Sequence, residues 1–337
     1  MKTKVFITGF AGMVGSHLTD YLLANTDYEI IGFIRWQENM ENVEHLFEEI
    51  NKNKRIKLYY GDINDINSIQ NSLELFMPDF VYHLAAQSYP LTSFTSPIDT
   101  LNTNIIGTEN LLSSCKKIVP NALIHVCSSS EVFGKVDKKN LPINEDVNFQ
   151  PASPYAISKI GTDLIGRFYA EAYNMKVLTT RMFTHTGPRR GDVFAESSFA
   201  KQIAMIENDL MEPIIRVGNL NSLRTWSDVR DAVRAYHLLL TVNPIKGEYY
   251  NIGGNYTCTV EEMLNFLISK SNSNKKIQIQ VDKNRLRPID ADLQVPDTTK
   301  FKKHTGWEPI FSFDQTMTDL LNYWRTKVNN KKIYLSR

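Results

Sequence analysis

Short apolar runs alternate with longer amphipathic stretches along the first half of the chain. Residues 5–7 and 80–82 are apolar without interruption, which is typical of strands buried on both faces of a parallel sheet. The stretches between such runs have the apolar spacing of helices. Strands are therefore expected at 4–8, 30–34, 56–60, 80–84, 123–127 and 177–182. This alternation predicts an α/β fold, a doubly wound parallel sheet covered by helices on both faces.

A glycine-rich segment follows the first expected strand. Gly9 would permit a tight turn, Gly12 would let the backbone approach a pyrophosphate, and Gly15 would let the next helix pack close to the sheet. The amino end of that helix, with Met13 and Val14, would face the anion. Three glycines at this spacing could form an ordinary turn, but the strand before and the helix after them indicate a Rossmann-type dinucleotide-binding site.

The end of the second expected strand bears on the choice of cofactor. Arg35 stands where an NAD-preferring site would usually place an acid for the ribose hydroxyl. A cation there favours the 2′-phosphate of NADP, so NADP is expected and NAD is less favoured. A surface arginine on a loop is the alternative. Residues after the third and fourth strands would flank the adenine and ribose: Asp62, Ile63, Leu84, Ala85 and Ala86.

Tyr155 and Lys159 are four residues apart on an expected helix, so both side chains rise from one face. A lysine ammonium and a cationic nicotinamide nearby would lower the pKa of the tyrosine, letting a phenolate accept a proton from a sugar hydroxyl. The spacing alone is weak, because about one such pair is expected by chance. Ser153 would start the helix, and residues 128–131 (Ser-Ser-Ser-Glu) follow the fifth strand, facing the same pocket. An exposed serine loop is the alternative.

Composition restricts the possible partners. The 38 Lys and Arg residues nearly balance the 37 Asp and Glu residues, so no global field recruits nucleic acid or a membrane surface. Three scattered cysteines fit a reducing cytoplasm and indicate neither disulfides nor a zinc site. No signal peptide or membrane helix is expected, since no apolar run approaches about 20 residues. The histidines show no metal-like clustering, and His83 and His125 are expected in the core. The basic segment 327–337 is expected as a solvated end.

The regular alternation fades after residue 183, where loops rich in Gly, Pro and Arg appear. Residues 1–183 are expected to form the NADP-binding Rossmann domain, and 184–337 mainly a smaller C-terminal α/β lobe that binds substrate. Later segments would return to the first domain. In the second part, Thr259 and Glu262 form an expected capping box that opens a helix.

Several longer motifs give the chain a specific resemblance. They are residues 128–135, Ser153-Pro154-Tyr155 with Lys159, His185 with residues 188–191, residues 218–220 with Arg224 and Trp226, and Arg287-Pro288 with Asp292. The chain resembles an extended short-chain dehydrogenase/reductase and is most similar to the GDP-mannose 4,6-dehydratases, including their relatives that act on GDP-manno-heptose. The resemblance covers nearly the whole chain. The segment from Thr184 to Ser197 resembles the heptose-using relatives more closely.

The resemblance implies 4,6-dehydration of a GDP-activated manno-configured sugar. Tyr155, beside Lys159, would take the proton of the 4-hydroxyl while hydride leaves carbon 4 for NADP, and Ser129 would hydrogen-bond that oxygen. Glu131 would remove the proton on carbon 5 and return a proton to the departing 6-hydroxyl. Hydride would then return to carbon 6 while Tyr155 reprotonates the intermediate, giving a 4-keto-6-deoxy nucleotide sugar. A carboxylate after the serines fits this cycle, because simple carbon-4 chemistry needs no base for carbon 5.

The resemblance also implies further binding residues. Arg224 and Arg287 would hold the diphosphate, since a guanidinium meets phosphate oxygens in pairs; each could instead form a surface salt bridge. The other implied substrate contacts are Ser88, Ser130, Glu131, Thr184 and Asn219, and the other implied cofactor contacts are Tyr155, Lys159, His185 and Arg190. Arg189 and Arg190 would reach a cofactor, in some relatives across a subunit interface. A homo-oligomer, dimer or tetramer, is therefore expected.

Three functions remain open at this point: a 4,6-dehydratase, a 4-epimerase or 4-dehydrogenase, and a non-catalytic sensor. A nucleotide-sugar 4-epimerase or 4-dehydrogenase would not need Glu131, and a non-catalytic NADP-binding sensor would not need Tyr155, Lys159 and Glu131 together. Within the leading reading, the substrate is GDP-D-glycero-manno-heptose or GDP-mannose. Ser129 replaces the usual threonine of the family and keeps its hydroxyl. The product would feed deoxysugar synthesis for a bacterial capsule or other surface polysaccharide.

Overall fold

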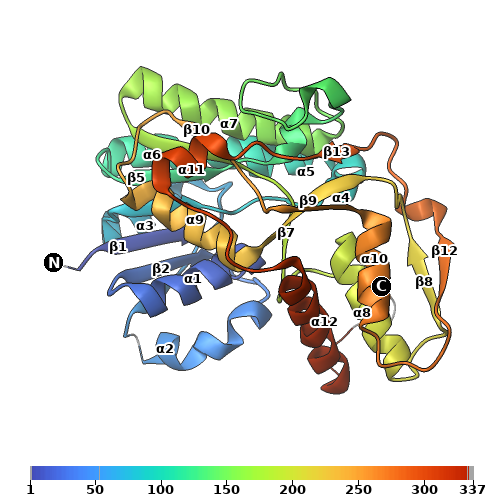
Figure 1. Cartoon of the computed structure of the whole chain (residues 1–337). Helices are drawn as coiled ribbons and strands as arrows, with labels where there is room; N and C mark the ends of the chain where they lie inside the picture. Colours follow the sequence, from blue (N-terminus) through green and yellow to red (C-terminus); the bar gives the residue numbers. More distant parts are fainter. Residues whose placement is uncertain (1, 53, 332, 334–337) are drawn as a thin grey trace.

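The main sheet places the carboxyl ends of its strands where a ligand can bind. The computed structural model describes residues 2–52, 54–331 and 333. Within these residues the main sheet has seven parallel strands, in the spatial order β3-β2-β1-β4-β5-β6-β10 (Figure 1). The strands are β1 (Lys4–Thr8), β2 (Glu29–Ile34), β3 (Ile56–Tyr60), β4 (Phe80–His83), β5 (Leu123–Cys127), β6 (Lys176–Met182) and β10 (Tyr249–Ile252). The strand order reverses between β1 and β4, where doubly wound sheets bind ligands.

Helices cover both faces of this sheet. On one face α1 (Met13–Asn25) packs against α9 (Val229–Thr241). On the other lie α3 (Ile66–Phe76), α6 (Gly107–Ile118) and α7 (Pro154–Tyr173), which contact one another in sequence order (Figure 1). Shorter helical segments connect these elements: η1 (Glu41–Leu46), α2 (Phe47–Asn51), α4 (Pro90–Thr95), α5 (Pro97–Leu101), η2 (Asn102–Ile106), η3 (Ser130–Phe133), η4 (Lys138–Asn140) and α11 (Thr299–Thr305).

Local sequence explains where the functional helix α7 begins and ends. The hydroxyl of Ser153 accepts a hydrogen bond from the N–H of Ala156 at 3.0 Å, and Pro154 takes the first helical position. Asn174 ends the helix in the left-handed conformation, with φ of +58°. The helix therefore starts one residue before Tyr155, as the sequence predicts.

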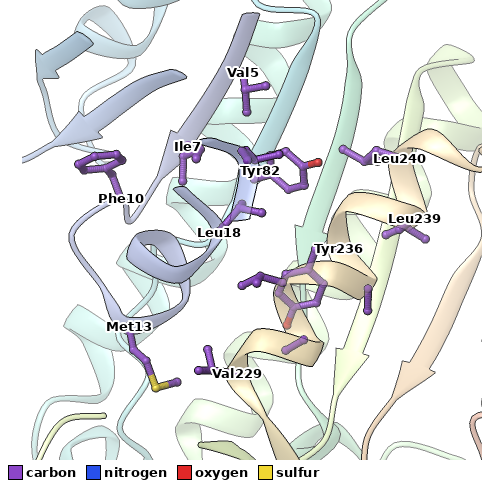
Figure 2. Close-up of a cluster of buried hydrophobic side chains, with 14 of the residues drawn as sticks. Val5, Ile7, Phe10, Met13, Leu18, Tyr82, Val229, Tyr236, Leu239 and Leu240 are labelled. Atoms are coloured by element: carbon purple, nitrogen blue, oxygen red, sulfur yellow. The ribbon is translucent and has the colours of Figure 1, made fainter. Parts of the chain in front are cut away.

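A single apolar layer joins the sheet to α1 and α9. Ile7 of β1, Tyr82 of β4, Leu18 of α1 and Tyr236 of α9 are fully buried and face one another (Figure 2). Burying each such side chain contributes roughly 1.5–3 kcal/mol relative to leaving it exposed. Because β1 and α1 share this layer, the turn between them is held on both sides.

The smaller lobe packs against the carboxyl edge of the sheet. Its strands are β7 (His185–Thr186), β8 (Ile214–Val217), β9 (Leu223–Asp228), β11 (Tyr256–Thr259), β12 (Gln278–Val281) and β13 (Leu293–Gln294). Strand β9 lies between β11 and β13 and also pairs with β7, whereas β8 pairs with β12. Its helical segments are α8 (Ala195–Glu207), α10 (Val260–Ser269), η5 (Lys283–Arg285) and α12 (Phe313–Asn329). Trp226 and Trp324 lie in the core of this lobe.

Most of the expected elements are confirmed. The six expected strands are present, with ends that differ by at most one residue, and the capping box of Thr259 and Glu262 opens α10. Strand β10 joins the edge of the main sheet late in the chain, and the domain boundary at residue 183 stays a prediction. In the described part of the chain, no helix has the length and apolar character needed to cross a bilayer.

The expectation of a solvated end at 327–337 is wrong for its first residues. Helix α12 continues to Asn329, and Lys327 forms an ion pair with Glu41 of η1. Val328 is buried in the core of the lobe. A basic segment can have a buried apolar face when it continues an amphipathic helix. Residues 332 and 334–337 lie outside the described residues.

Candidate active site

A cleft of about 1030 Å³ opens where the smaller lobe meets the carboxyl ends of the main-sheet strands. The sheet contributes Gly9 and Cys127 to its wall, and the lobe contributes Asn219 and Val260. Every residue predicted for the site lines this cleft: Gly9, Gly12, Met13, Val14, Arg35, Asp62, Ile63, Leu84, Ala85, Ala86, Ser88, Ser129, Ser130, Glu131, Tyr155, Lys159, Thr184, His185, Arg190, Asn219, Arg224 and Arg287. The fold thus brings them together, while their individual roles stay predictions.

The glycine turn leaves no room for side chains. Gly9 has φ of +72°, a conformation that favours glycine. A Cβ atom on Gly15 would lie 2.3 Å from the carbonyl oxygen of Gly9, and one on Gly9 would lie 2.8 Å from the amide nitrogen of Ala85. Helix α1 then starts at Met13 after Gly12, which has no side chain to cap it. Its first N–H groups have no carbonyl partner within the helix, so the turn fits the pyrophosphate of a dinucleotide.

The segment after β4 is tied to β1 by one buried hydroxyl. Thr8 Oγ1 accepts hydrogen bonds from the N–H groups of Leu84 and Ala85, both at 3.1 Å, and lies 2.9 Å from Nδ1 of His83. This hydroxyl holds the 84–86 segment beside the glycine turn. Both segments therefore form one continuous wall of the cleft at the point where the strand order reverses.

Tyr155 is buried, and its hydroxyl forms a hydrogen bond with the side chain of Ser129. Burial raises the pKa of Tyr155, whereas the hydrogen bond with Ser129 and the charge of Arg190 lower it, and the net direction is upward. Ser129 also accepts a hydrogen bond from the N–H of Glu131 at 3.2 Å, as the cap of η3. The serine thus connects the tyrosine to the short helix that carries the carboxylate.

The lowering of the Tyr155 pKa by Lys159 and a bound nicotinamide stays a prediction, and Lys159 is not among the main causes that set the pKa of Tyr155 in this structure. The Lys159 ammonium instead donates a hydrogen bond to the carbonyl oxygen of Cys127 at 2.7 Å, and burial lowers its pKa. Its backbone carbonyl accepts from the hydroxyl of Ser128 at 3.1 Å. Lys159 therefore joins α7 to the end of β5, because a buried ammonium must find acceptors and the nearest ones belong to the strand.

Glu131 lies between two arginines of the smaller lobe. Its Oε1 atom is 3.8 Å from Nη1 of Arg224 and 3.8 Å from Nη1 of Arg287. All three side chains are at most about a quarter exposed. Arg224 and Arg287, which are predicted to bind the diphosphate, thus form ion pairs with Glu131, which is predicted to be the base.

A polar cluster holds Arg287 and Asn219 at the edge of the lobe. Nε of Arg287 lies 3.8 Å from Oδ1 of Asp290, and the Asn219 amide donates to Oδ2 of Asp290 at 2.9 Å. The same amide lies 3.2 Å from the hydroxyl of Ser222 and 3.2 Å from Oδ1 of Asp292. These contacts connect the loop after β8 to the loop before β13.

The two arginines of the Pro-Arg-Arg motif both line the cleft but contact different carboxylates. Arg189 has φ of +70° and donates to Oδ2 of Asp20 at 2.7 Å, within its own chain. Arg190 faces the cleft, where its Nε donates to Oε1 of Glu196 at 3.2 Å. Beside it, burial and then the charge of Arg190 lower the pKa of His185 to about 4. His185 is therefore neutral near pH 7.

His83 and His125 fit a structural role. His83 and His125 are buried as expected, and burial lowers the pKa of each to about 3. His83 Nε2 lies 2.9 Å from the hydroxyl of Thr108, and His125 Nε2 lies 2.8 Å from that of Thr180. Among the described residues, no group of three or more His, Cys, Asp or Glu side chains is arranged to hold a metal ion.

Sequence reasoning missed several charged residues of the cleft. Glu38 forms an ion pair with Arg35, and Asp192 pairs with the nearly buried Lys201 at 2.9 Å. Arg285 donates to the hydroxyl of Ser198 at 3.1 Å and also lines the cleft. Lys201 carried a usable signal, because a lysine inside an apolar helical run must find a buried partner. Glu38 carried none beyond its nearness to Arg35.

Comparisons with known proteins identify the family of the chain. The family model described as GDP-mannose 4,6 dehydratase matches residues 6–320. GDP-mannose 4,6 dehydratase 1 of Arabidopsis thaliana is 32% identical over 317 residues, which are 92% of this chain and 86% of the plant protein.

Solved structures share the fold over nearly the full length. RMD from Pseudomonas aeruginosa, complexed with NADPH, has a TM-score of 0.80 and 27% identity and covers 97% of this chain and 100% of that one. The dTDP-glucose 4,6-dehydratase DesIV from Streptomyces venezuelae, with NAD and TYD bound, has a TM-score of 0.84 and 25% identity and covers 97% and 98%. The Rossmann-type fold is thereby confirmed. With its family model matched from residue 6 to residue 320, the chain belongs to the GDP-mannose 4,6-dehydratase family.

Proposed function

We propose that the protein catalyses NADP-dependent 4,6-dehydration of a GDP-activated manno-configured sugar, either GDP-D-glycero-manno-heptose or GDP-mannose. The product is the 4-keto-6-deoxy nucleotide sugar. One observation carries the proposal: Glu131 lines the same cleft as Tyr155 and the glycine turn. Membership of the family supports nucleotide-sugar 4,6-dehydratase activity.

The proposed cofactor is a nicotinamide dinucleotide held by the glycine turn and by Arg35. The solved relatives with NADPH and with NAD support this class of cofactor. Arg35 favours NADP, because a guanidinium binds a phosphate group in a paired geometry. When bound, the cofactor supplies the hydride acceptor for carbon 4 and the hydride donor for carbon 6 of the sugar.

Tyr155 is the proposed proton acceptor for the 4-hydroxyl of the sugar. Its hydrogen bond with Ser129 would orient the phenol toward that oxygen. Because burial raises the pKa of Tyr155, its deprotonation depends on positive charge brought into the cleft. His185 is neutral and contributes none.

Glu131 is the proposed base for carbon 5 and the proton donor for the leaving 6-hydroxyl. Arg224 and Arg287 would bind the diphosphate, and both lie 3.8 Å from the Glu131 carboxylate. A diphosphate at the two guanidinium groups would therefore bring the attached sugar close to the carboxylate. Proximity of this kind accounts for much of the gain in enzymatic proton transfer.

The test is incubation of the purified protein with NADP and, in separate reactions, each of the two GDP sugars, followed by mass spectrometry of the intact nucleotide sugar. Loss of one water without net NADPH is expected, and the sugar that reacts names the substrate. Loss of two hydrogens would instead indicate a 4-dehydrogenase. A sugar unchanged in mass would be consistent with epimerisation at carbon 4, whereas no turnover of any nucleotide sugar with retained NADP binding would indicate a non-catalytic sensor.

A Glu131→Gln variant examines the base directly. The amide keeps the shape of the side chain but cannot take up the proton, so dehydration should fall by about 10²- to 10⁴-fold. NADP binding should be retained. The matched control is Glu171→Gln, at an exposed position near the end of α7, which should dehydrate at the wild-type rate. Full turnover by Glu131→Gln would rule out the proposed base.

The protein is also proposed to form a homo-oligomer. Ile157, Leu164 and Phe168 are about half exposed on α7, at helical spacings that place them on one stripe. Ile98 and Ile106 extend the exposed apolar surface onto α5 and η2, which contact α7. Exposed apolar surface of this kind favours association. Sedimentation velocity of the purified protein should give a mass above that of one chain, and a pure monomer would contradict this.

A further inference from the structure

Glu38 lies beside the arginine expected to distinguish NADP from NAD. Nε of Arg35 donates to Oε2 of Glu38 at 2.9 Å, and Nη2 of Arg35 donates to Oε1 at 3.4 Å. The backbone N–H of Glu38 donates to the carbonyl of Arg35 at 3.2 Å, so a turn holds the two residues together. Both side chains line the cleft. The Glu38 carboxylate therefore occupies the side of the guanidinium where Nε and Nη2 can bind one anion together.

The surroundings of Arg35 are acidic. The hydrogen bond with Glu38 is the largest cause of a raised pKa of Arg35, and the charges of Glu38, Asp62 and Asp99 add to it. All three carboxylates line the cleft with Arg35. An incoming anion thus meets one guanidinium and several carboxylates, rather than an open basic site.

The two cofactors differ at this position by one phosphate group. A phosphate monoester carries about −1.5 to −2 charges at neutral pH, so it is attracted to Arg35 and repelled by Glu38. A phosphate also binds best to two neighbouring N–H groups of a guanidinium, and in Arg35 the Nε and Nη2 groups already donate to Glu38. The 2′-hydroxyl of NAD has no charge and can donate a hydrogen bond to a carboxylate. Glu38 therefore disfavours NADP and accommodates NAD.

We infer that Glu38 is a specificity-determining residue, whose carboxylate limits the preference of Arg35 for NADP and keeps NAD as a usable ligand. The inference rests on the proposed function only in that the ligand is a nicotinamide dinucleotide. It does not depend on the sugar or on dehydration. Removing the negative charge while keeping the shape of the side chain should release the guanidinium for the phosphate.

The test is calorimetric titration of the full-length protein with NADP⁺ and with NAD⁺, without any sugar. The Glu38→Gln variant should bind NADP⁺ about five- to tenfold more tightly than the wild type, because one carboxylate no longer repels the phosphate across a partly solvated gap. Its affinity for NAD⁺ should stay the same or fall up to about threefold, since an amide is a weaker acceptor than a carboxylate. In Arg35→Gln, the affinity for NADP⁺ should fall about tenfold or more, and the affinity for NAD⁺ should change little.

The matched control is Glu48→Gln. Glu48 lies on α2, which follows Glu38 in the connection between β2 and β3, and it is mostly exposed and pairs with Lys52. Removing its charge should leave the affinities for NADP⁺ and NAD⁺ unchanged. An NADP⁺ to NAD⁺ affinity ratio in Glu38→Gln within twofold of the wild type would overturn the inference. A lower ratio would also overturn it, because Glu38 would then position Arg35 for the phosphate. A wild-type protein that binds neither dinucleotide would overturn the proposed function together with this inference.

Discussion

The two walls of the cleft are built by different physical means. The sheet wall is main chain: at Gly9 and Gly15 the backbone approaches itself so closely that one added carbon atom would clash. The lobe wall is side-chain charge: Arg224 and Arg287 extend from separate segments and meet at Glu131. The first wall is proposed to bind the pyrophosphate that dinucleotides share, and the second is proposed to bind the diphosphate of the nucleotide sugar. Substitutions in the two walls should therefore impair different properties of the protein.

Acid should weaken the sheet side of the molecule most. Burial lowers the pKa of His17 to about 4 and that of His83 and His125 to about 3. Folded pKa values below the unfolded value of about 6.5 mean that the unfolded chain takes up these protons first. The stability is fully present above about pH 6.5 and is lost as the pH falls toward the folded values. Each histidine should cost roughly 2 kcal/mol between pH 7 and pH 5.

Urea unfolding at the two pH values measures this loss. The unfolding free energy should be several kcal/mol lower at pH 5, and the drop should be smaller in His125→Gln, which takes up no proton at that position. No histidine occurs in α8, α10 or α12, so the effect distinguishes the two regions. An identical drop in His125→Gln would show that protonation of His125 does not contribute to the acid sensitivity.

Gly15→Ala should break the sheet wall by overpacking. The new Cβ atom would lie 2.3 Å from the carbonyl oxygen of Gly9 and 2.6 Å from that of Phe10. We expect a loss of roughly 1–3 kcal/mol in unfolding free energy, together with weaker binding of NADP and NAD alike. The control is Gly191→Ala, whose Cβ would meet only Val193, at 3.9 Å. Wild-type stability and cofactor affinity in Gly15→Ala would refute the close-packed turn.

Arg224→Lys should weaken the lobe wall without breaking it. Lysine keeps the charge but loses the paired hydrogen bonds to a phosphate, so KM for the nucleotide sugar should rise about tenfold, whereas kcat should fall less than about threefold. Cofactor affinity should not change. Arg216→Lys, at an exposed position on β8, is the control. An unchanged KM would remove Arg224 from the diphosphate site.

The link between the two regions should have the smallest effect. Lys327 of α12 pairs with Glu41 of η1 and lines the cleft beside Trp324. A partly exposed pair of this kind contributes about 1 kcal/mol or less, so Lys327→Met should lower the unfolding free energy by that amount. Its KM for the nucleotide sugar should stay at the wild-type value. A larger loss would mean that the contact between α12 and η1 governs the stability of the whole chain.

The sequence predicted the sheet wall better than the lobe wall. The glycine turn, the strand before it and the start of α7 at Pro154 depend on neighbouring residues, and local rules of backbone geometry are enough to find them. The predicted site residues that follow the strands of the main sheet line one cleft, because the carboxyl ends of parallel strands meet at one edge.

The partners of the charged groups could not be predicted. Lys159 bonds a backbone carbonyl at Cys127, and a sequence does not reveal which carbonyls are free. Glu131 meets Arg224 and Arg287 only after three distant segments fold together. Arg35 predicted a phosphate site, yet its pairing with Glu38 depends on a turn that no residue pattern identifies.

Glu131 is proposed to be the base for carbon 5, and this role would make the cleft the site of a dehydratase. The most direct measurement is the reaction in D₂O with NADP and the GDP sugar that reacts, following deuterium at carbon 5 by NMR or mass spectrometry. With Glu131 as the base, we expect the wild type to incorporate deuterium at carbon 5, and Glu131→Gln to incorporate it at least about 10²-fold more slowly while still oxidising carbon 4. Incorporation by Glu131→Gln at the wild-type rate would contradict it and assign the carbon-5 proton to another residue.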